Sequence, residues 1–162
     1  MRRILYLVRH AEAVTARDGT DKLRALTQRG ESDALQLATY IKEKDSNPNL
    51  ILTNPATRAL TTAQIIARQL SYDLKNIRVE DSIYSARKLE ILKLLTNLTD
   101  PIHQVMLVGH YPTIVELYNY LSENESKQTM KPAEMCSLAF DVPWAEVTVG
   151  CGASSSSFHP CL

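Results

Sequence analysis

The chain has 162 residues, 44% of them hydrophobic and 22% charged, which is an ordinary composition for one globular domain with a sizeable core. Its 18 basic and 18 acidic side chains cancel to a formal net charge of zero, which argues against broad binding to nucleic acid or to an anionic membrane surface. No apolar run approaches the roughly 18 residues of a membrane span, and the apolar stretch near the amino terminus is too short for a signal peptide. We therefore expect a single domain, residues 1–162, located in the cytoplasm, with neither nucleic acid nor a membrane as partner.

The cysteines and the lack of standard cofactor motifs both bear on whether the chain binds a metal or a cofactor. Cys136, Cys151 and Cys161 are an odd number of cysteines without a signal peptide, which predicts reduced thiols. Cys151 and Cys161 lie near His159, but this spacing matches none of the common zinc patterns. The sequence also lacks a P-loop, a GxGxxG motif and a paired-aspartate metal site. We therefore expect neither a metal nor an organic cofactor.

The stretch from Ile4 to Glu12 organises the predicted fold. Apolar and aromatic residues run directly into Arg9 and His10, after which the sequence turns polar. Such a short apolar run is typical of a strand buried on both faces, which requires helices above and below the sheet. We predict an α/β fold, a three-layer α/β/α sandwich with a mostly parallel central sheet. Ligands of such sheets collect outside the carboxyl ends of the strands, where Arg9 and His10 lie.

A long loop and a helix follow this strand. Residues 12–24 show no periodicity, and they predict a loop longer than the roughly 2–6 residues that are usual between a strand and a helix. Long loops at this edge of a sheet are often functional. Thr27 is the predicted N-cap of the helix, and its buried face is marked by Ala34, Leu37, Ala38 and Ile41.

Two further strand–helix units are predicted. Residues 50–53 form a short buried strand, after which Asn54 and Pro55 provide an N-cap and a first helical residue. Residues 105–109 form the clearest strand after the first, and His110 and another helix follow it. The buried stripe of the helix after Pro55 is expected at Leu60, Ala63, Ala67 and Leu70.

The remaining segments are less regular. Residues 77–79 predict a weak strand, and residues 137–142 and 146–149 predict edge strands. The Ser-rich stretch 152–157 is a short low-complexity loop by composition. A third helix is predicted from the spacing of Leu89, Leu92, Leu95 and Leu98.

Three strand–helix junctions deliver Arg9 with His10, Arg58 and His110 to one edge of the sheet. Arg58 lies in the first helical turn, where the helix dipole disfavours a cation by about 0.3–1 kcal/mol and a bound anion would reverse that sign. Arg9 and Arg58 have the fork geometry that binds phosphate, and N–H groups at helix N-termini add donors. Neutral imidazole can act as a nucleophile. These residues predict a phosphate site that works without metal or nucleotide.

Four segments resemble, in order, the motifs of the histidine phosphatase (phosphoglycerate mutase-like) superfamily. The small size of the chain, residues 24–27 and the ending 158–162 look most like the SixA branch, which acts on phosphohistidine. Together the four motifs cover most of the chain. LVRHAE at 7–12 is similar to the Arg-His-Gly signature, and Leu26-Thr27 with Gly30 is similar to LTxxG. TNPATRALTTA at 53–63 is similar to SPxxRAxxTA, and Val108-Gly109-His110 is similar to the second-histidine motif.

The resemblance implies a mechanism and a partner. It implies that His10 is the nucleophile and becomes phosphohistidine, and that water then hydrolyses this intermediate. Arg9, Arg58 and His110 would hold the phosphoryl group, and Arg24 would add a contact from the long loop. The implied partner is a phosphorylated protein, such as a histidine-containing phosphotransfer domain, or a small phosphorylated substrate.

Three positions depart from the family pattern. Ala11 stands where the signature has Gly, and alanine penalises a positive φ that glycine accepts. Residues 14–16 offer no counterpart to an asparagine that often follows the nucleophile. The general acid of larger members aligns near Ser82, so the acid is Glu80, Asp81 or none. An imidazole leaving group can depart already protonated, so a missing acid favours a phosphohistidine substrate.

Two alternatives stay open. The same catalytic residues can serve small phosphomonoesters or phosphoserine peptides, because one site geometry serves many substrates. The other alternative is a non-catalytic phosphate-binding interaction module, which Ala11 and the unassigned acid favour and the intact His10 and Arg58 oppose.

Overall fold

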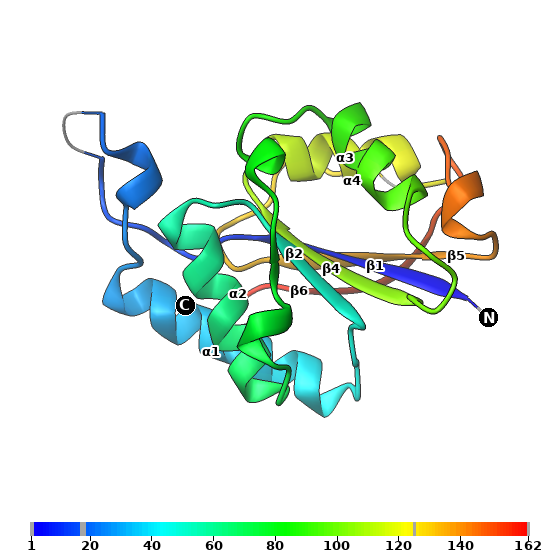
Figure 1. Ribbon diagram of the computed structural model, residues 1–162. Helices are drawn as coiled ribbons and strands as arrows, with labels where there is room; N and C mark the ends of the chain where they lie inside the picture. Colours follow the sequence, from blue (N-terminus) through cyan, green and yellow to red (C-terminus); the bar gives the residue numbers. More distant parts are fainter. Residues whose placement is uncertain (1, 17–18, 125, 162) are drawn as a thin grey trace.

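The computed structural model describes residues 2–16, 19–124 and 126–161. Its strands are β1 (Arg3–Arg9), β2 (Leu50–Thr53), β3 (Arg78–Val79), β4 (Gln104–Gly109), β5 (Met135–Phe140) and β6 (Ala153–Phe158). They form one sheet in the order β3-β2-β4-β1-β5-β6 (Figure 1). β1 and β2 pair in parallel with β4, and β3 pairs in parallel with β2, whereas β5 is antiparallel to β1 and β6. The sheet is therefore mostly parallel, as predicted.

The two central strands, β1 and β4, are buried on both faces. Alternate side chains of β1 enter two separate hydrophobic cores, with Leu5 and Leu7 on one face and Tyr6 and Val8 on the other. β4 alternates in the same way because it runs parallel to β1 in register. This double burial explains the continuous apolar run that marks both strands in the sequence.

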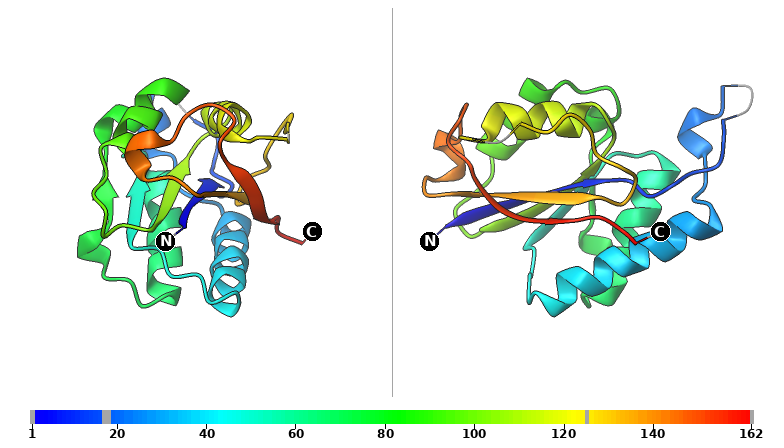
Figure 2. Two further views of the ribbon diagram at one scale, coloured as in Figure 1. Left: turned by 90° about the vertical axis from the view of Figure 1, so that its right-hand side faces the viewer. Right: turned by 180° about the vertical axis from the view of Figure 1, so that it is seen from behind.

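Helices cover both faces of the sheet and confirm the predicted three-layer sandwich. α1 (Gln28–Glu43) and α2 (Thr57–Gln69) lie on one face, and α3 (Lys88–Thr96) and α4 (Thr113–Leu121) lie on the other (Figures 1 and 2). Within the described residues, none of the helices is long and apolar enough to cross a membrane. Short 3₁₀ helices complete the fold: η1 (Asp21–Leu23), η2 (Leu74–Asn76), η3 (Asp81–Tyr84) and η4 (Trp144–Glu146).

The starts of α1 and α2 differ in how closely they follow the prediction. Thr27 is the N-cap of α1, and its side chain accepts a hydrogen bond from the Gly30 N–H at 2.9 Å, as predicted. The predicted start of α2 was wrong, because the helix begins two residues later and has Ala56 as its N-cap. Asn54 instead accepts the Ala56 N–H at 2.9 Å and so shapes the turn that leads into the helix.

The buried stripes of two helices also differ from the prediction. All four predicted core residues of α1 are buried, but Leu60 and Leu70 of the α2 stripe are only partly buried. In α3, Leu95 is buried together with Ile91, whereas Leu89 is 54% exposed. α3 ends at Thr96, so Leu98 lies beyond it and packs against the core from the following turn. The leucine spacing alone did not reveal which side of α3 faces the sheet.

The carboxyl-terminal part of the chain corrects three predictions. β5 is an interior strand between β1 and β6, not an edge strand. Residues 146–149 form no strand, since η4 ends at Glu146 and a turn follows. The Ser-rich stretch predicted as a loop is the edge strand β6, where Ser156 donates its N–H to the Ser137 hydroxyl at 2.9 Å. A search for apolar runs does not detect this serine-rich strand, because β6 is held by main-chain pairing to β5 more than by apolar burial.

Most of the predicted long loop is described. It contains η1, and Ala13 forms an isolated antiparallel bridge with Leu26, so the loop is pinned at its base. Arg17 and Asp18 of this loop, and Leu162 of the tail, lie outside the described residues. In Figure 1 the loop extends from the carboxyl end of β1 before the chain enters α1.

Candidate active site

The register of the sheet brings the strand-end residues together. Arg9 of β1 pairs with Gly109 of β4, so His10 and His110 follow adjacent positions of neighbouring strands. The His10 N–H donates to the Gly109 carbonyl at 3.0 Å and extends this pairing by one residue. Arg58 comes from the first turn of α2, which follows β2 on the other side of β4. The structure therefore places the predicted residues at one edge of the sheet.

His10 is buried, with 7% of its surface exposed, and both ring nitrogens have partners. Nδ1 lies 2.8 Å from the Ala11 carbonyl oxygen, which can only accept, so Nδ1 carries the proton. Nε2 then has a free lone pair, toward which Arg58 Nε donates at 3.3 Å. Burial, reinforced by the nearby Arg58 and Arg9 charges, lowers the His10 pKa to about 4. His10 is therefore a neutral imidazole whose Nε2 lone pair faces the arginine.

Arg58 is held on all sides of its guanidinium. Its side chain is only 7% exposed. Nη1 donates to the main-chain oxygen of Asp21 at 2.8 Å, and Nη2 donates to Asp21 Oδ2 at 3.2 Å. The main chain of Arg58 is tied to the His10 segment through Thr62, whose hydroxyl donates to the Arg58 carbonyl at 2.8 Å and accepts the Ala11 N–H at 3.0 Å. Thr62 is thus a link between β1 and α2 that the sequence did not assign.

Arg9 and His110 also lie close enough to His10 for their charges to act on its pKa. Arg9 Nη1 donates to the Met130 carbonyl at 2.6 Å, and its guanidinium lies 5.5 Å from the centre of the Tyr111 ring. The buried Nε of Arg9 has no hydrogen-bond partner within the described part of the chain. Burial lowers the pKa of both Arg9 and His110, and for His110 the Arg58 and Arg9 charges add to this while Asp21 opposes it.

Arg24 reaches the site only through another residue. Its Nε donates to the Val14 carbonyl at 2.7 Å, and its Nη1 donates to Asp21 Oδ1 at 3.2 Å. Asp21 in turn binds Arg58, so the loop arginine is joined to the strand-end residues by a shared carboxylate.

Asp21 and Tyr84 are site residues that the sequence analysis missed. The Tyr84 hydroxyl donates a short hydrogen bond to Asp21 Oδ2. This bond, with the Arg24 and Arg58 contacts, lowers the Asp21 pKa to about 2 although burial acts in the opposite direction. Tyr84 ends η3, the segment predicted to supply a general acid. Two features of the sequence could have revealed them. Asp21 is an acidic residue in the long loop at the functional edge of the sheet, and Tyr84 carries a hydroxyl close to the position where the acid aligns.

Neither candidate acid contacts the site. Glu80 pairs with Arg78 of its own segment, and Asp81 is exposed. Within the described chain, neither carboxylate forms a hydrogen bond or ion pair with His10, Arg58 or His110. Of the three predicted options, Glu80, Asp81 or no general acid, the geometry therefore favours no carboxylate acid from this segment.

The LTxxG segment has a structural role behind the nucleophile. The Thr27 N–H donates to the Glu12 carbonyl at 3.0 Å, and its hydroxyl donates to Glu12 Oε1 at 2.8 Å. A Cβ on Gly30 would lie 2.1 Å from the Glu12 carbonyl oxygen, so only glycine allows α1 to approach this closely. Ala11 is accommodated without the expected strain, because it is not among the described residues that adopt a positive φ.

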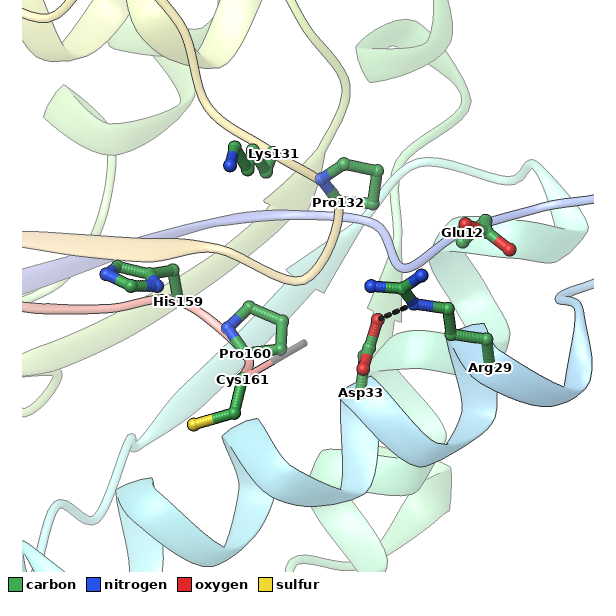
Figure 3. Close-up of a pocket in the computed structure, with 8 residues that line it drawn as sticks. All are labelled: Glu12, Arg29, Asp33, Lys131, Pro132, His159, Pro160 and Cys161. Atoms are coloured by element: carbon green, nitrogen blue, oxygen red, sulfur yellow. Dashed lines mark ion pairs between the residues drawn. The ribbon is translucent and has the colours of Figure 1, made fainter.

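Two hollows flank this edge of the sheet. One, of about 650 Å³, runs from His110 and Pro112 along the start of α3. The other, of about 520 Å³, lies between α1, the segment before β5 and the tail after β6. Figure 3 shows Arg29 and Asp33 facing each other there, and the Arg29 Nε–Asp33 Oδ2 ion pair has a length of 3.7 Å. This hollow contains none of the predicted site residues, so the candidate site is on the side of His110. Among the described residues, no group of three or more His, Cys, Asp or Glu side chains is placed to hold a metal ion.

Comparisons with known proteins agree with this geometry. Residues 5–82, which include His10 and Arg58, match the family model of the histidine phosphatase superfamily (branch 1). No curated protein matches the sequence significantly. The match to the family model over residues 5–82, just under half of the chain, and the fold of the whole chain together support a phosphatase similar to those of the histidine phosphatase superfamily.

Solved structures of SixA proteins share this fold. The protein histidine phosphatase SixA complexed with tungstate has a TM-score of 0.85 at 20% identity, covering 98% of this chain and 97% of that chain. A putative phosphohistidine phosphatase SixA from Nakamurella multipartitia has a TM-score of 0.82 at 21% identity, covering 100% and 98% of the two chains. The putative phosphohistidine phosphatase SixA from Agrobacterium tumefaciens has a TM-score of 0.81 at 25% identity, covering 98% and 99%. The chain has the SixA-type fold along nearly its whole length.

Proposed function

We propose that this phosphatase removes the phosphoryl group from phosphohistidine on a protein, through a covalent phosphohistidine at His10, and that residues 1–162 act as one domain. The observation that carries the proposal is the pair of hydrogen bonds that the two His10 ring nitrogens form. Nδ1 donates to the Ala11 carbonyl, while the lone pair of Nε2 accepts a hydrogen bond from Arg58 Nε. A buried imidazole with a pKa of about 4 stays neutral at neutral pH and is available as a nucleophile.

In the first step, Nε2 of His10 attacks phosphorus. The bond from phosphorus to the leaving nitrogen breaks, and the electron pair goes to that nitrogen, so a phosphohistidine substrate departs as imidazole. Arg9, Arg58 and His110 surround the transferred group. The unpartnered Nε of Arg9 is a donor that a phosphoryl oxygen can use. Donors fixed before the substrate arrives stabilise the charge of the transition state without reorganisation.

In the second step, water attacks the phosphorus of phospho-His10, and the electron pair of the P–N bond returns to Nε2. Because Nδ1 keeps its proton on the Ala11 carbonyl, the phosphorylated ring is cationic and leaves as neutral imidazole. A neutral leaving group departs easily, so this step makes little demand on an acid. The same reasoning applies to the substrate imidazole and fits a site that neither Glu80 nor Asp81 contacts.

The substrate class is supported by the branch and by the chemistry of the site. Solved structures that share the fold along the whole chain are named as protein histidine or phosphohistidine phosphatases. A phosphorylated protein, such as a histidine-containing phosphotransfer domain, is therefore the proposed partner. Small phosphomonoesters and phosphoserine peptides are the competing substrates, and their alkoxide leaving groups require an acid.

Intact-mass spectrometry under alkaline conditions tests the proposal. The enzyme is mixed with a phosphotransfer domain that carries phosphohistidine, and a single phosphoryl adduct is expected to accumulate in His110→Ala and to turn over in the wild type. His159→Ala is the matched control, because it removes a histidine of the exposed tail and is expected to behave like the wild type. Absence of an adduct on His10, with the substrate phosphate unchanged, would contradict the proposal.

The ratio of kcat/KM values decides the substrate class. A phosphohistidine protein is compared with a panel of phosphate esters and a phosphoserine peptide. We expect the phosphohistidine protein to be preferred by at least about 100-fold, which corresponds to the difference made by one general acid. Equal or better turnover of an ester would assign the site to the competing class.

A further inference from the structure

Asp21 brings a negative charge into a site otherwise built from cations. Among the described residues, it is the one acidic side chain that forms an ion pair with the arginines proposed to bind the phosphoryl group. Its main-chain oxygen accepts from Arg58 Nη1 at 2.8 Å and its Oδ2 accepts from Nη2 at 3.2 Å. Since Arg58 Nε donates to His10, every nitrogen of this guanidinium has a protein partner before substrate binds.

The position of the Asp21 carboxylate is fixed from three directions. Tyr84 reaches it from η3, Arg58 from α2, and Arg24 from the C-cap of η1, three residues after Asp21. These donors keep the carboxylate ionised, with a pKa of about 2, although 43% of the side chain is exposed. A single exposed ion pair contributes little, but a carboxylate shared by three donors is held in one place.

The charges of the site nearly balance those of a phosphoryl group. Arg9, Arg24 and Arg58 carry three positive charges, Asp21 carries one negative charge, and His10 is neutral. The sum is two positive charges, against about 1.5–2 negative charges on a phosphoryl group at pH 7. Without Asp21 the three arginines would exceed that negative charge by about 1–1.5 units.

We propose that Asp21 is a built-in competitor for phosphate. Its carboxylate occupies the Nη2 donor of Arg58 in the free enzyme, gives it up to the incoming phosphoryl group, and takes it back when inorganic phosphate leaves. Asp21 is thus a positioning residue that acts through Arg58 and sets the rate of product release. This inference rests on the proposed function, because it requires Arg58 to bind the transferred group.

Isothermal titration with inorganic phosphate tests the competition directly. Asp21→Asn keeps the size and an oxygen acceptor for Tyr84 and Arg58 but removes the charge. We expect it to bind inorganic phosphate about tenfold more tightly than the wild type, because one like charge beside the anion is removed at a partly screened position. Asp21→Glu retains the charge and is expected to bind phosphate within about twofold of the wild type, on the same electrostatic ground.

The matched control is Asp141→Asn. It makes the same chemical change and alters the net charge by the same amount, but Asp141 pairs with exposed Arg2 and follows β5 at the opposite end of β1. Its affinity for inorganic phosphate is expected to equal that of the wild type. A change in this variant as large as in Asp21→Asn would overturn the proposal in favour of a general effect of net charge.

Turnover gives a second readout that a merely structural role would not move in this way. In Asp21→Asn we expect KM and kcat to fall together, because substrate and product are both held more tightly. Unchanged or weaker phosphate binding in Asp21→Asn would overturn the competition. The His10 adduct experiment reports on the proposed function separately, so an adduct without the expected affinity change rejects only the role of Asp21.

Discussion

Two parts of the molecule build the candidate site by different means. The scaffold part consists of the strand–helix junctions that carry Arg9, His10, Arg58 and His110, and their positions follow from the register of β1 and β4 and from the start of α2. The loop part is η1 with its neighbours, where Asp21 is placed by side-chain contacts to Arg58 and other donors. Main-chain pairing therefore positions the reacting group, His10, whereas the side-chain ion pairs of Asp21 adjust the charge around it.

Replacing the nucleophile is the most severe test of the scaffold part. His10→Ala removes the atom that forms the bond to phosphorus, so we expect kcat to fall by at least about 10⁴-fold, as for other nucleophile deletions. The adduct detected by mass spectrometry should vanish while far-UV circular dichroism is unchanged. Residual turnover above a hundredth of the wild-type rate would show that another group attacks phosphorus.

Arg58→Lys tests whether fork geometry matters at the scaffold. Lysine keeps the charge but loses the donor toward His10 and the paired donors of the guanidinium. We expect kcat/KM to fall by about 10²–10³-fold, the range found when a transition-state donor is removed. Steady-state kinetics on the phosphohistidine protein measures this change, and a loss below about fivefold would contradict the role given to Arg58.

Arg24→Lys makes the same change in the loop part. Within the described part of the chain, Arg24 contacts Asp21 and Val14 and forms no hydrogen bond with His10, so its effect should be indirect. We expect kcat/KM to fall by only about two- to fivefold, in keeping with the small energies of partly exposed ion pairs. If Arg24→Lys and Arg58→Lys gave equal losses in the same assay, the division of the site into scaffold and loop parts would be wrong.

The pH dependence is the smallest expected effect and tests the burial of His10. Protonation removes the Nε2 lone pair, so the nucleophile is lost as the pH falls through its pKa of about 4. Between pH 7 and pH 5 we expect the rate of adduct formation to fall by less than about twofold, whereas an ordinary histidine would lose more than about tenfold. Rapid-quench measurement of the adduct over this range distinguishes the two, with the uncatalysed hydrolysis of the phosphohistidine substrate measured at each pH and subtracted.

The scaffold part could be predicted because each of its residues directly follows a pattern that the sequence displays. One strand buried on both faces ends at Arg9, and another ends directly before His110. Both strands therefore place their polar residues at the carboxyl end of the parallel sheet. Arg58 stayed in the first turn of α2 even though the helix starts two residues later than predicted. An error of two residues in the helix start does not change the predicted site, because Arg58 lies in the first helical turn in either case.

The loop part could not be predicted because its contacts depend on tertiary structure. Tyr84 and Asp21 are 63 residues apart in the chain, and no local periodicity connects them. The general acid was sought in η3 as a carboxylate, whereas this segment supplies a hydroxyl that holds a carboxylate from elsewhere. Alignment of motifs finds positions, but it does not find side-chain contacts between segments that are distant in the chain.

The edge strand β6 has a consequence for how copies of this protein meet. An open strand edge offers unpaired N–H and C=O groups to any neighbouring chain, and apolar side chains there favour pairing between molecules. β6 places Ser154, Ser155 and Ser157 on exposed positions, and Pro160 follows soon after the strand. Water competes well for such a surface, so the serines act as gatekeepers against sheet extension, and replacing them with valine would create a segment prone to aggregate.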